Sequence, residues 1–261
     1  MNLDLFYKVD PEWEWYIGEI YHKLIAGNCN NCNTVVEFAP GYRYKIGYAL
    51  SKDNFNGTLY LIDSNSNVVD YVVEKYKTLL PNANIIGINK NLTDSILLLP
   101  DKIDLFLSNH SIDDMIISEY LDEATQKEVF NNEDLSKELL LKKWEKLSAD
   151  KEIQETIKSK VFNEFASFFD KVSTDLIIMS QYKSNEYFVN NGNFADDITR
   201  DLFLKLKNCI PTNDDFVNSL LAFYAKEDDE RFKDINVLNN TQNASNWIVG
   251  KFNKDSVEAI L

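Results

Sequence analysis

The feature that most constrains the fold of this chain is a regular alternation of short apolar runs with segments of helical spacing. The apolar runs are rich in branched side chains and lie at 34–38, 58–62, 84–88, 103–107 and 175–179. Helical patterns follow the first three of them, at 44–50, 68–80 and 93–99. Strands separated by helices of this size pair in parallel through right-handed crossovers. The sequence therefore predicts an α/β fold, a doubly wound and mostly parallel Rossmann-like sheet with helices on both faces.

We expect a single domain over residues 1–261, in which two segments depart from the alternation. Residues 1–33 are rich in aromatic side chains and carry a helical pattern from Glu12 to Ala26. Between the fourth and fifth strands lie roughly fifty residues, more than a usual crossover, with two helical patterns. They predict a helical insertion over 121–172, whose first, highly charged helix covers the site. A last strand is expected at 246–252, near an edge of the sheet.

Charge and hydropathy limit the partners of the chain. Lys and Arg number 27 against 42 Asp and Glu, a net charge of -15, which opposes binding to a nucleic-acid backbone. The longest apolar runs, such as 96–99, are too short to span a bilayer, so no membrane partner is expected. Residues 1–14 lack a basic stretch followed by an apolar one, as a signal peptide would have. We therefore expect a cytoplasmic protein.

Two of the cysteines, Cys29 and Cys32, form a C-x-x-C pattern, and Cys209 lies far downstream. A zinc site needs about four ligands, and only His22 is a nearby addition. A thioredoxin-like redox pair would open a helix, whereas this pair precedes a strand. We interpret the segment as a polar loop with incidental thiols and expect no metal.

Polar or turn-forming residues follow each of the first four predicted strands. In an open parallel sheet, ligands bind outside the carboxyl ends of the strands, at the point where strand order reverses. Asp63 ends the second strand, where an acidic side chain can accept both hydroxyls of a ribose. The alternative is that Asp63 is a helix N-cap or a solvated strand end, since the run Asp63-Ser64-Asn65-Ser66 also suits the start of the next helix.

The loop after the first strand indicates which nucleoside ligand fits. A pyrophosphate requires a glycine-rich turn, so that backbone amides can approach its oxygens. Here Gly41 is the only glycine, and bulky side chains follow it at 42–44. A dinucleotide is therefore disfavoured. S-adenosylmethionine carries no phosphate and tolerates a turn with fewer glycines.

Residues Val35–Gly41 resemble motif I of class I S-adenosylmethionine-dependent methyltransferases, in the variant E-x-x-P-G. Asp63 matches the acidic residue that this family has at the end of strand two, and residues 108–110 correspond in position to its motif after strand four. Tyr44 replaces a later motif I glycine, and Asn89 and Asn91 stand where an acidic residue often contacts adenine. The resemblance implies S-adenosylmethionine as cofactor. The implied cofactor-binding residues are Glu37, Ala39, Pro40, Gly41, Tyr42, Asp63, Ser64, Asn89, Asn91 and Asn109.

Methyl transfer requires that the enzyme position and desolvate a nucleophile and remove its proton where it has one. His110 titrates near neutral pH and is predicted at the ligand-facing end of strand four, so we expect it to be the catalytic base. Asn109 beside it can accept a hydrogen bond from an amine. We expect Asp113, Tyr16 and Trp144 to contact the substrate.

The most favoured function is methylation of a nitrogen or oxygen nucleophile on a small molecule. Two alternatives stay open. One is a non-methylating enzyme on the same fold that transfers an aminopropyl or amino-carboxypropyl group. The other is a catalytically inactive nucleoside-binding or scaffold protein. A small-molecule acceptor is the expected partner, and the oligomeric state is left open, with a homodimer as one option.

Overall fold

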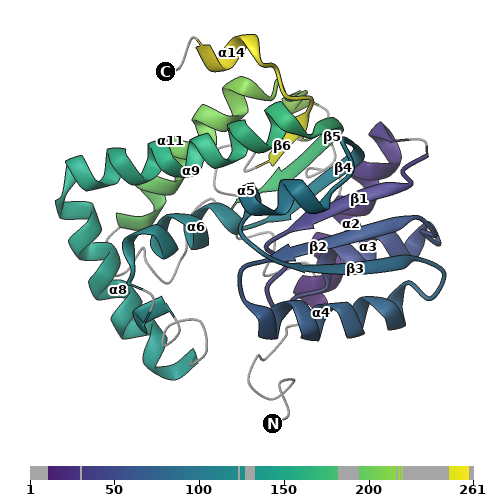
Figure 1. The fold of residues 1–261 in the computed structure, drawn as a ribbon, viewed down its shortest axis with the longest axis horizontal. Helices are drawn as coiled ribbons and strands as arrows, with labels where there is room; N and C mark the ends of the chain where they lie inside the picture. The colour runs from purple at the N-terminus through teal and green to yellow at the C-terminus, as the bar shows by residue number, and fades with distance from the viewer. Residues whose placement is uncertain are drawn as a thin grey trace.

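The predicted alternation forms a six-stranded sheet in the order β3-β2-β1-β4-β5-β6 (Figure 1). The computed structural model describes residues 11–29, 31–122, 124–126, 133–181, 194–215, 217, 219 and 247–258. Strands β1 to β5 run parallel, and β6 is antiparallel to β5 at the edge. The predicted fold class and the edge position of the last strand are therefore confirmed. The strands are β1 (Thr34–Phe38), β2 (Thr58–Asp63), β3 (Asn84–Asn89), β4 (Lys102–Asn109), β5 (Ser173–Ser180) and β6 (Trp247–Gly250).

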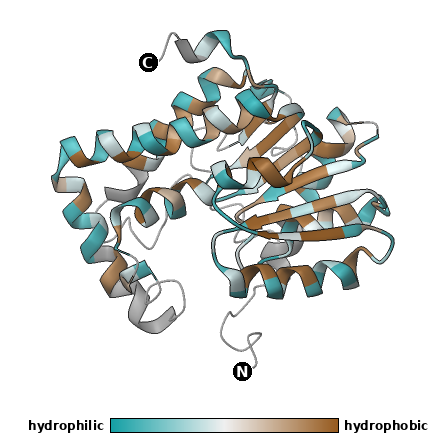
Figure 2. Cartoon of the chain, viewed as in Figure 1, coloured by the Kyte–Doolittle hydropathy of each residue, from teal (hydrophilic) through white to brown (hydrophobic). Residues whose placement is uncertain are grey.

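Successive side chains of the central strands enter different apolar clusters, one on each face of the sheet. Val35 and Leu105 belong to one cluster, whereas their neighbours Val36 and Phe106 belong to the other. This is the pattern of a parallel sheet covered on both sides, and it explains why the strands read as continuous apolar runs. In Figure 2 the centre of the sheet is accordingly mostly brown, the colour of hydrophobic residues.

Helices cover both faces of the sheet. One face packs against α2 (Pro11–Asn28), α3 (Lys45–Lys52) and α4 (Ser66–Leu79). The other face carries a group of helices that extends to one side of the sheet (Figure 1). These are α5 (Leu92–Ser95), the 3-10 turn η1 (Ile96–Leu98), α6 (Ser111–Tyr120), α8 (Glu133–Ala149), α9 (Lys151–Lys171) and α11 (Phe194–Cys209). A short helix, α14 (Asp255–Glu258), follows β6.

Helices α8 and α9 lie in the stretch of chain between β4 and β5. α9 packs on the sheet as its apolar spacing predicted, with Phe168 and Phe169 against Phe106 of β4 at ring-centroid distances of 5.3 and 5.0 Å. In α8, Trp144 is 4% exposed and belongs to the same apolar cluster as Leu147. Trp144 is thus a packing residue in this structure, and its predicted contact with substrate stays a prediction.

At the edge formed by the amino ends of the strands, hydrogen bonds to the backbone and a disulfide hold the segment that precedes β1. Asp104 at the start of β4 accepts hydrogen bonds from the backbone N–H groups of Asn33 and Thr34, at 2.7 and 2.9 Å. Cys29 and Cys32 form a disulfide there, with their Cα atoms 6.2 Å apart. The interpretation of these cysteines as incidental thiols is therefore wrong, because the loop brings both into bonding distance.

Within the described part of the chain, no helix is both long enough and apolar enough to cross a membrane.

Candidate functional site

The strand order reverses between β1 and β4, because the chain first moves outward through β2 and β3 and then returns to the other side of β1. Ligands of open α/β sheets bind at such a point, outside the carboxyl ends of the strands. The register brings the predicted site residues to this edge. Asp63 pairs with Asn89 across β2 and β3, and Phe38 pairs with Ser108 across β1 and β4.

The turn between β1 and α3 faces open space. Ala39 and Gly41 have positive φ angles of 52° and 58°, so the backbone reverses sharply through Pro40. A Cβ atom added at Gly41 would meet no atom within 4 Å. Tyr42, the next residue, is 9% exposed and packs edge-on against Tyr71 of α4. The turn therefore leaves room for a ligand over Gly41.

Asp63 lies at the end of β2, beside this turn. Its Oδ1 accepts a hydrogen bond from the backbone N–H of Asn65 at 2.9 Å, and the backbone of Gly41 also donates to the carboxylate. Desolvation outweighs these bonds and raises the pKa of Asp63 to about 6. The residue that caps α4 is Asn65, which accepts from the N–H of Asn67, so the cap role considered for Asp63 is wrong. Ser64, next to it, is exposed.

The side chain of Glu37 is 3% exposed and is hydrogen-bonded inside the protein, next to the turn. Its Oε2 accepts a hydrogen bond of 2.5 Å from the Tyr76 hydroxyl of α4, and that hydroxyl accepts from the backbone N–H of Gly47 in α3 at 3.0 Å. The carboxylate thus ties β1 to both following helices. Its predicted contact with the cofactor stays a prediction.

The two asparagines after β3 also have partners within the protein. The side-chain amide nitrogen of Asn89 donates to the carbonyl of Asp63 at 3.1 Å. Asn91 is the N-cap of α5, and its side-chain oxygen accepts from the N–H of Asp94 at 2.7 Å. Asn89 therefore borders the Asp63 position directly, whereas the oxygen of Asn91 is engaged by its helix.

His110 follows β4 and stands at the N-terminus of α6. Its φ of 59° is left-handed, a conformation that histidine, like asparagine and aspartate, adopts more often than other residues with a Cβ, and its backbone N–H donates to the carbonyl of Ser180 at 2.9 Å. Desolvation, followed by the nearby positive charge of Lys45 in α3, holds the pKa of His110 well below its usual range. The imidazole is therefore neutral at physiological pH, the state that a general base requires.

Three titratable side chains at this edge have shifted pKa values. Asp63 and His110 are half-buried and Asp114 is exposed, yet desolvation is the first cause of the shifted pKa of each of them. The negative charges of Asp113 and Asp63 add to desolvation in raising the pKa of Asp114, so these carboxyls share one local environment.

A buried polar network that sequence reasoning missed lies directly behind Asn109. The Tyr21 hydroxyl of α2 donates to the carbonyl oxygen of Ser108 at 2.6 Å and lies 3.0 Å from Oγ of Ser180. Oγ of Ser180 lies 2.9 Å from the side-chain oxygen of Asn109. The Tyr21 ring packs edge-on against Trp247 of β6 at 5.0 Å. No local pattern identifies this network, because Tyr21 and Ser180 are 159 residues apart.

The remaining predicted residues differ in how far the structure describes them. Asp113 accepts a hydrogen bond from the side-chain nitrogen of Gln181 at 2.9 Å, which links α6 to the end of β5. Tyr16 is part of α2, but its side chain lies outside the described residues. His22, expected to be structural, contacts Asp53 at 3.0 Å.

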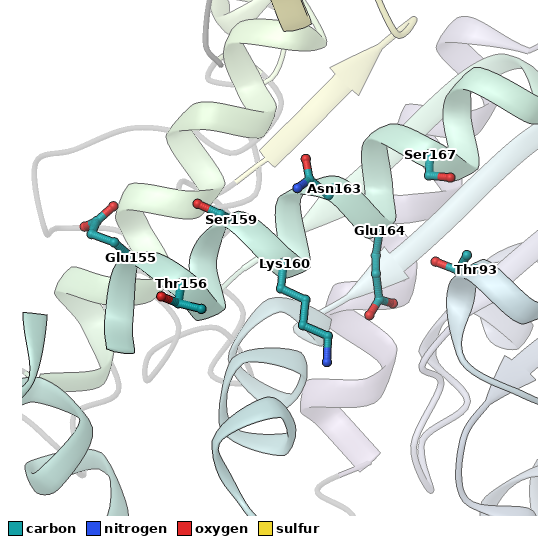
Figure 3. A pocket seen from close by; sticks show the side chains of 8 residues that line it. All are labelled: Thr93, Glu155, Thr156, Ser159, Lys160, Asn163, Glu164 and Ser167. Carbon is teal, nitrogen blue, oxygen red and sulfur yellow. The ribbon is translucent and has the colours of Figure 1, made fainter. Parts of the chain in front are cut away.

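An open groove on the outside of α9 is separate from this site (Figure 3). It contains none of the predicted site residues. Lys160 and Glu164 of α9 point into it together with Thr93 of α5, and Lys160 is ion-paired to Glu119 of α6. The groove therefore follows from the packing of α9 beside α5.

No family model matches the sequence, and no curated protein matches it significantly. Among solved structures, the chain is similar to the bifunctional kinase-methyltransferase WbdD, with a TM-score of 0.42 and 9% identity over 73% of this chain and only 34% of that one. It is similar to magnesium protoporphyrin IX methyltransferase (ChlM) from Synechocystis PCC 6803, with a TM-score of 0.37 and 11% identity over 69% of each chain. It is also similar to the plantazolicin methyltransferase BpumL, with a TM-score of 0.42 and 10% identity over 96% of this chain and 88% of that one. The fold assignment above rests on the strand order of this chain's own sheet.

Proposed function

We propose that this protein binds S-adenosylmethionine at the carboxyl edge of its sheet and transfers the methyl group to a nitrogen or oxygen of a small molecule. The observation that carries the proposal is the position of Asp63 beside the turn at Gly41, where the backbone N–H of Ala39 donates to the carbonyl of Ile62 at 2.8 Å. An acidic side chain that can hold a ribose lies against a turn with open space above its single glycine. Such a pair suits a nucleoside without a pyrophosphate.

The electrostatics of the site suit a cationic cofactor. Asp63, Asp113 and Asp114 lie in one environment, and desolvation raises the pKa values of Asp63 and Asp114. A sulfonium and an ammonium group would favour the ionised form of such carboxyls. A dinucleotide would instead bring phosphates toward negative charges. The site residues proposed for the cofactor are those of the turn, Asp63 with Ser64, and Asn89.

The chemistry proposed for the acceptor rests on Asn109 and His110. A bound S-adenosylmethionine supplies an activated methyl group, so the protein has to place the nucleophile and accept its proton. His110, held neutral, is the proposed base, and Asn109 is the proposed orienting group. Asp113 would contribute where the acceptor is cationic.

Titration calorimetry tests the cofactor assignment. S-adenosylhomocysteine should bind, and NAD and ATP should bind far more weakly. Asp63→Ala should weaken the binding of S-adenosylhomocysteine by roughly 1.5–3 kcal/mol, the loss of hydrogen bonds to a charged group. Asp70→Ala, which removes an exposed carboxylate of α4, is the matched control and should have no effect. Binding of NAD as tight as that of S-adenosylhomocysteine contradicts the proposal.

Methyl transfer to a panel of small amines and hydroxyl compounds tests the reaction class. The mass of the product separates the outcomes, because a methyl group adds less mass than an aminopropyl or amino-carboxypropyl group. Cofactor binding without transfer to any compound would favour a nucleoside-binding protein.

We also propose that α8 covers the bound acceptor. It lies between β4 and β5 in the chain, and Trp144 fixes its C-terminal half to the apolar cluster of α9. Hydrogen exchange of the described part of α8 should slow when cofactor and acceptor are both bound. Equal exchange in the free and bound protein would make α8 a static packing element.

A further inference from the structure

The polar network behind Asn109 contains more oxygen–oxygen contacts than it has hydroxyl hydrogens. The Tyr21 hydroxyl lies 2.6 Å from the carbonyl oxygen of Ser108 and 3.0 Å from Oγ of Ser180, and Oγ of Ser180 lies 2.9 Å from the side-chain oxygen of Asn109. Each of these three contacts needs one hydrogen between its two oxygens. Tyr21 and Ser180 together supply two.

The position of the Tyr21 hydroxyl hydrogen is unambiguous. A carbonyl oxygen only accepts, so the bond between Tyr21 and Ser108 uses the hydrogen of Tyr21. Tyr21 keeps that hydrogen, because burial raises its pKa above the usual range. The hydroxyl of Ser180 must then serve both Tyr21 and Asn109, and it has one hydrogen.

Rotating the Asn109 side-chain amide by 180° supplies the missing hydrogen, because it exchanges the amide oxygen for the amide nitrogen. The amide nitrogen then faces Ser180 and donates to its Oγ, Ser180 donates to Tyr21, and Tyr21 donates to Ser108. The positions of the amide oxygen and nitrogen are an assignment that the hydrogen bonds decide. All three contacts are then satisfied, which matters because Tyr21 is fully buried and Ser180 is 6% exposed.

We propose that Tyr21 and Ser180 are positioning residues that turn the Asn109 amide so that its nitrogen faces Ser180 and its oxygen faces the acceptor. Neither residue touches the reacting atoms. The consequence for the acceptor rests on the proposed function: an amide oxygen selects a nucleophile that carries a hydrogen, an amine or a hydroxyl. A nucleophile without a hydrogen would receive no bond from this group.

The orientation can be measured without any acceptor, by NMR of the Asn109 side-chain amide. Asn109→Ala assigns the two proton signals. In the wild-type protein one of them should be shifted downfield and exchange slowly, because it is hydrogen-bonded to Ser180. In Ser180→Ala both signals should move to the positions of a solvated amide. Tyr48→Phe, which removes a hydroxyl that contacts Glu19 at 3.5 Å, is the matched control and should change neither signal.

The kinetic consequence is tested with S-adenosylmethionine and the panel compound that is methylated fastest. Ser180→Ala and Tyr21→Phe should each raise the KM of that compound about 3- to 10-fold, with affinity for S-adenosylhomocysteine unchanged, as for the loss of one neutral hydrogen bond. In an Asn109→Ala background neither substitution should raise the KM further. If the substitutions acted through a general loss of packing, their effects on the KM would instead add to that of Asn109→Ala.

Asn109 amide signals that do not respond to Ser180→Ala overturn the inference, whatever the activity. Additive losses in the Asn109→Ala background overturn it as well. If the panel shows no methyl transfer while the amide signals behave as expected, the proposed function fails and the positioning of Asn109 stands. Should Tyr21→Phe not fold, Ser180→Ala carries both measurements.

Discussion

The two edges of the same sheet use similar residues in opposite ways. At the amino ends of the strands, a carboxylate, Asp104, accepts two backbone N–H groups of the segment before β1. A glycine there, Gly57, lies so close to the chain that an added Cβ would be 2.1 Å from the carbonyl oxygen of Asn33. Polar groups and glycine at this edge serve close packing of the backbone.

At the carboxyl ends, a carboxylate and a glycine stand beside open space. Asp63 has a raised pKa of about 6, and a Cβ at Gly41 would meet nothing within 4 Å. Two residues with side chains, Ala39 and His110, hold positive φ angles at this edge. Asn54, just before β2 at the other edge, also has a positive φ, of 52°. What the carboxyl edge adds is a pair of side chains, Asp63 and His110, whose pKa values are shifted mainly by desolvation, a combination typical of binding sites.

The largest expected effect at the carboxyl edge concerns His110. His110→Ala should lower turnover by about 100- to 10,000-fold and leave the affinity for S-adenosylhomocysteine nearly intact, if His110 is the general base. His22→Gln, which changes the other histidine, is the control and should keep its activity. Full activity of the His110 variant would remove this residue from the mechanism.

The pH dependence of the wild-type rate tests the same residue in another way. An imidazole with an ordinary pKa of about 6.5 would lose its function as a base below that pH. Burial and Lys45 lower the pKa of His110, so the neutral form persists to more acidic solution. The acid limb of the pH profile should therefore lie well below 6.5. A limb at or above 6.5 would show that burial and the positive charge of Lys45 do not lower the pKa of the group that limits the rate.

Substituting one glycine at each edge and measuring the free energy of unfolding compares how tightly the two edges are packed. Gly57→Ala should lower the free energy of unfolding by about 2–3 kcal/mol, because its Cβ would collide with backbone that cannot move aside. Gly41→Ala should cost only about 1 kcal/mol, the penalty for a side chain at positive φ. Urea denaturation measures both. Equal losses in the two variants would mean that the turn at Gly41 is as tightly packed as the opposite edge.

Asp63 should oppose stability in the absence of ligand. Because its folded pKa is raised from 3.8 to about 6, the folded state holds the proton more tightly, and stability falls as the pH rises through this window. Asp63→Asn should therefore stabilise the ligand-free protein at pH 7.5 by about 1–2 kcal/mol, allowing for partial screening by solvent, and have no effect near pH 3.5. Thermal unfolding at the two pH values measures this difference. A loss of stability at pH 7.5 would place Asp63 with Asp104 as a structural residue.

The smallest expected effect is at Ala39. Glycine tolerates the φ of 52° that Ala39 adopts but is more flexible when unfolded, so Ala39→Gly should change the unfolding free energy by at most about 0.5 kcal/mol, in the stabilising direction. Denaturation of this variant beside Gly41→Ala shows how much of the strain in the turn resides in each residue. A clear destabilisation would mean that the methyl group of Ala39 contributes packing that outweighs its strain.

The strands and the first three helices could be predicted because their signals are local. Val35 and Val36 face opposite apolar clusters. Because both faces of the strand are buried, apolar residues occupy successive positions, and the strand is visible in the sequence as a run of branched residues. Helix α11 (Phe194–Cys209) was not predicted, although Ile198, Leu202 and Leu206 recur at a spacing of four and are buried as that spacing indicates.

The site could be predicted only in part. The positions of Asp63 and His110 at the carboxyl edge follow from their places at strand ends, since parallel strands end at one edge, and their roles stay predictions. The role of Asn65 as the cap of α4 instead of Asp63 depends on backbone angles that the order Asp63-Ser64-Asn65 does not reveal. The partners of Asn109 come from β5 and α2, and no spacing in the sequence connects them.

The packing of Tyr21 against Ser180 and Trp247 has a consequence for the synthesis of the protein. These contacts join an early segment of the chain to segments that leave the ribosome much later. Emerging chains acquire structure from the N-terminal side, and contacts between distant residues form slowly. A nascent chain that has completed β1 to β4 can therefore pair its strands while Asn109 still has no fixed orientation. The orientation of Asn109 should be fixed only in a separate, later event of translation, when β5 and β6 pack against helix α2.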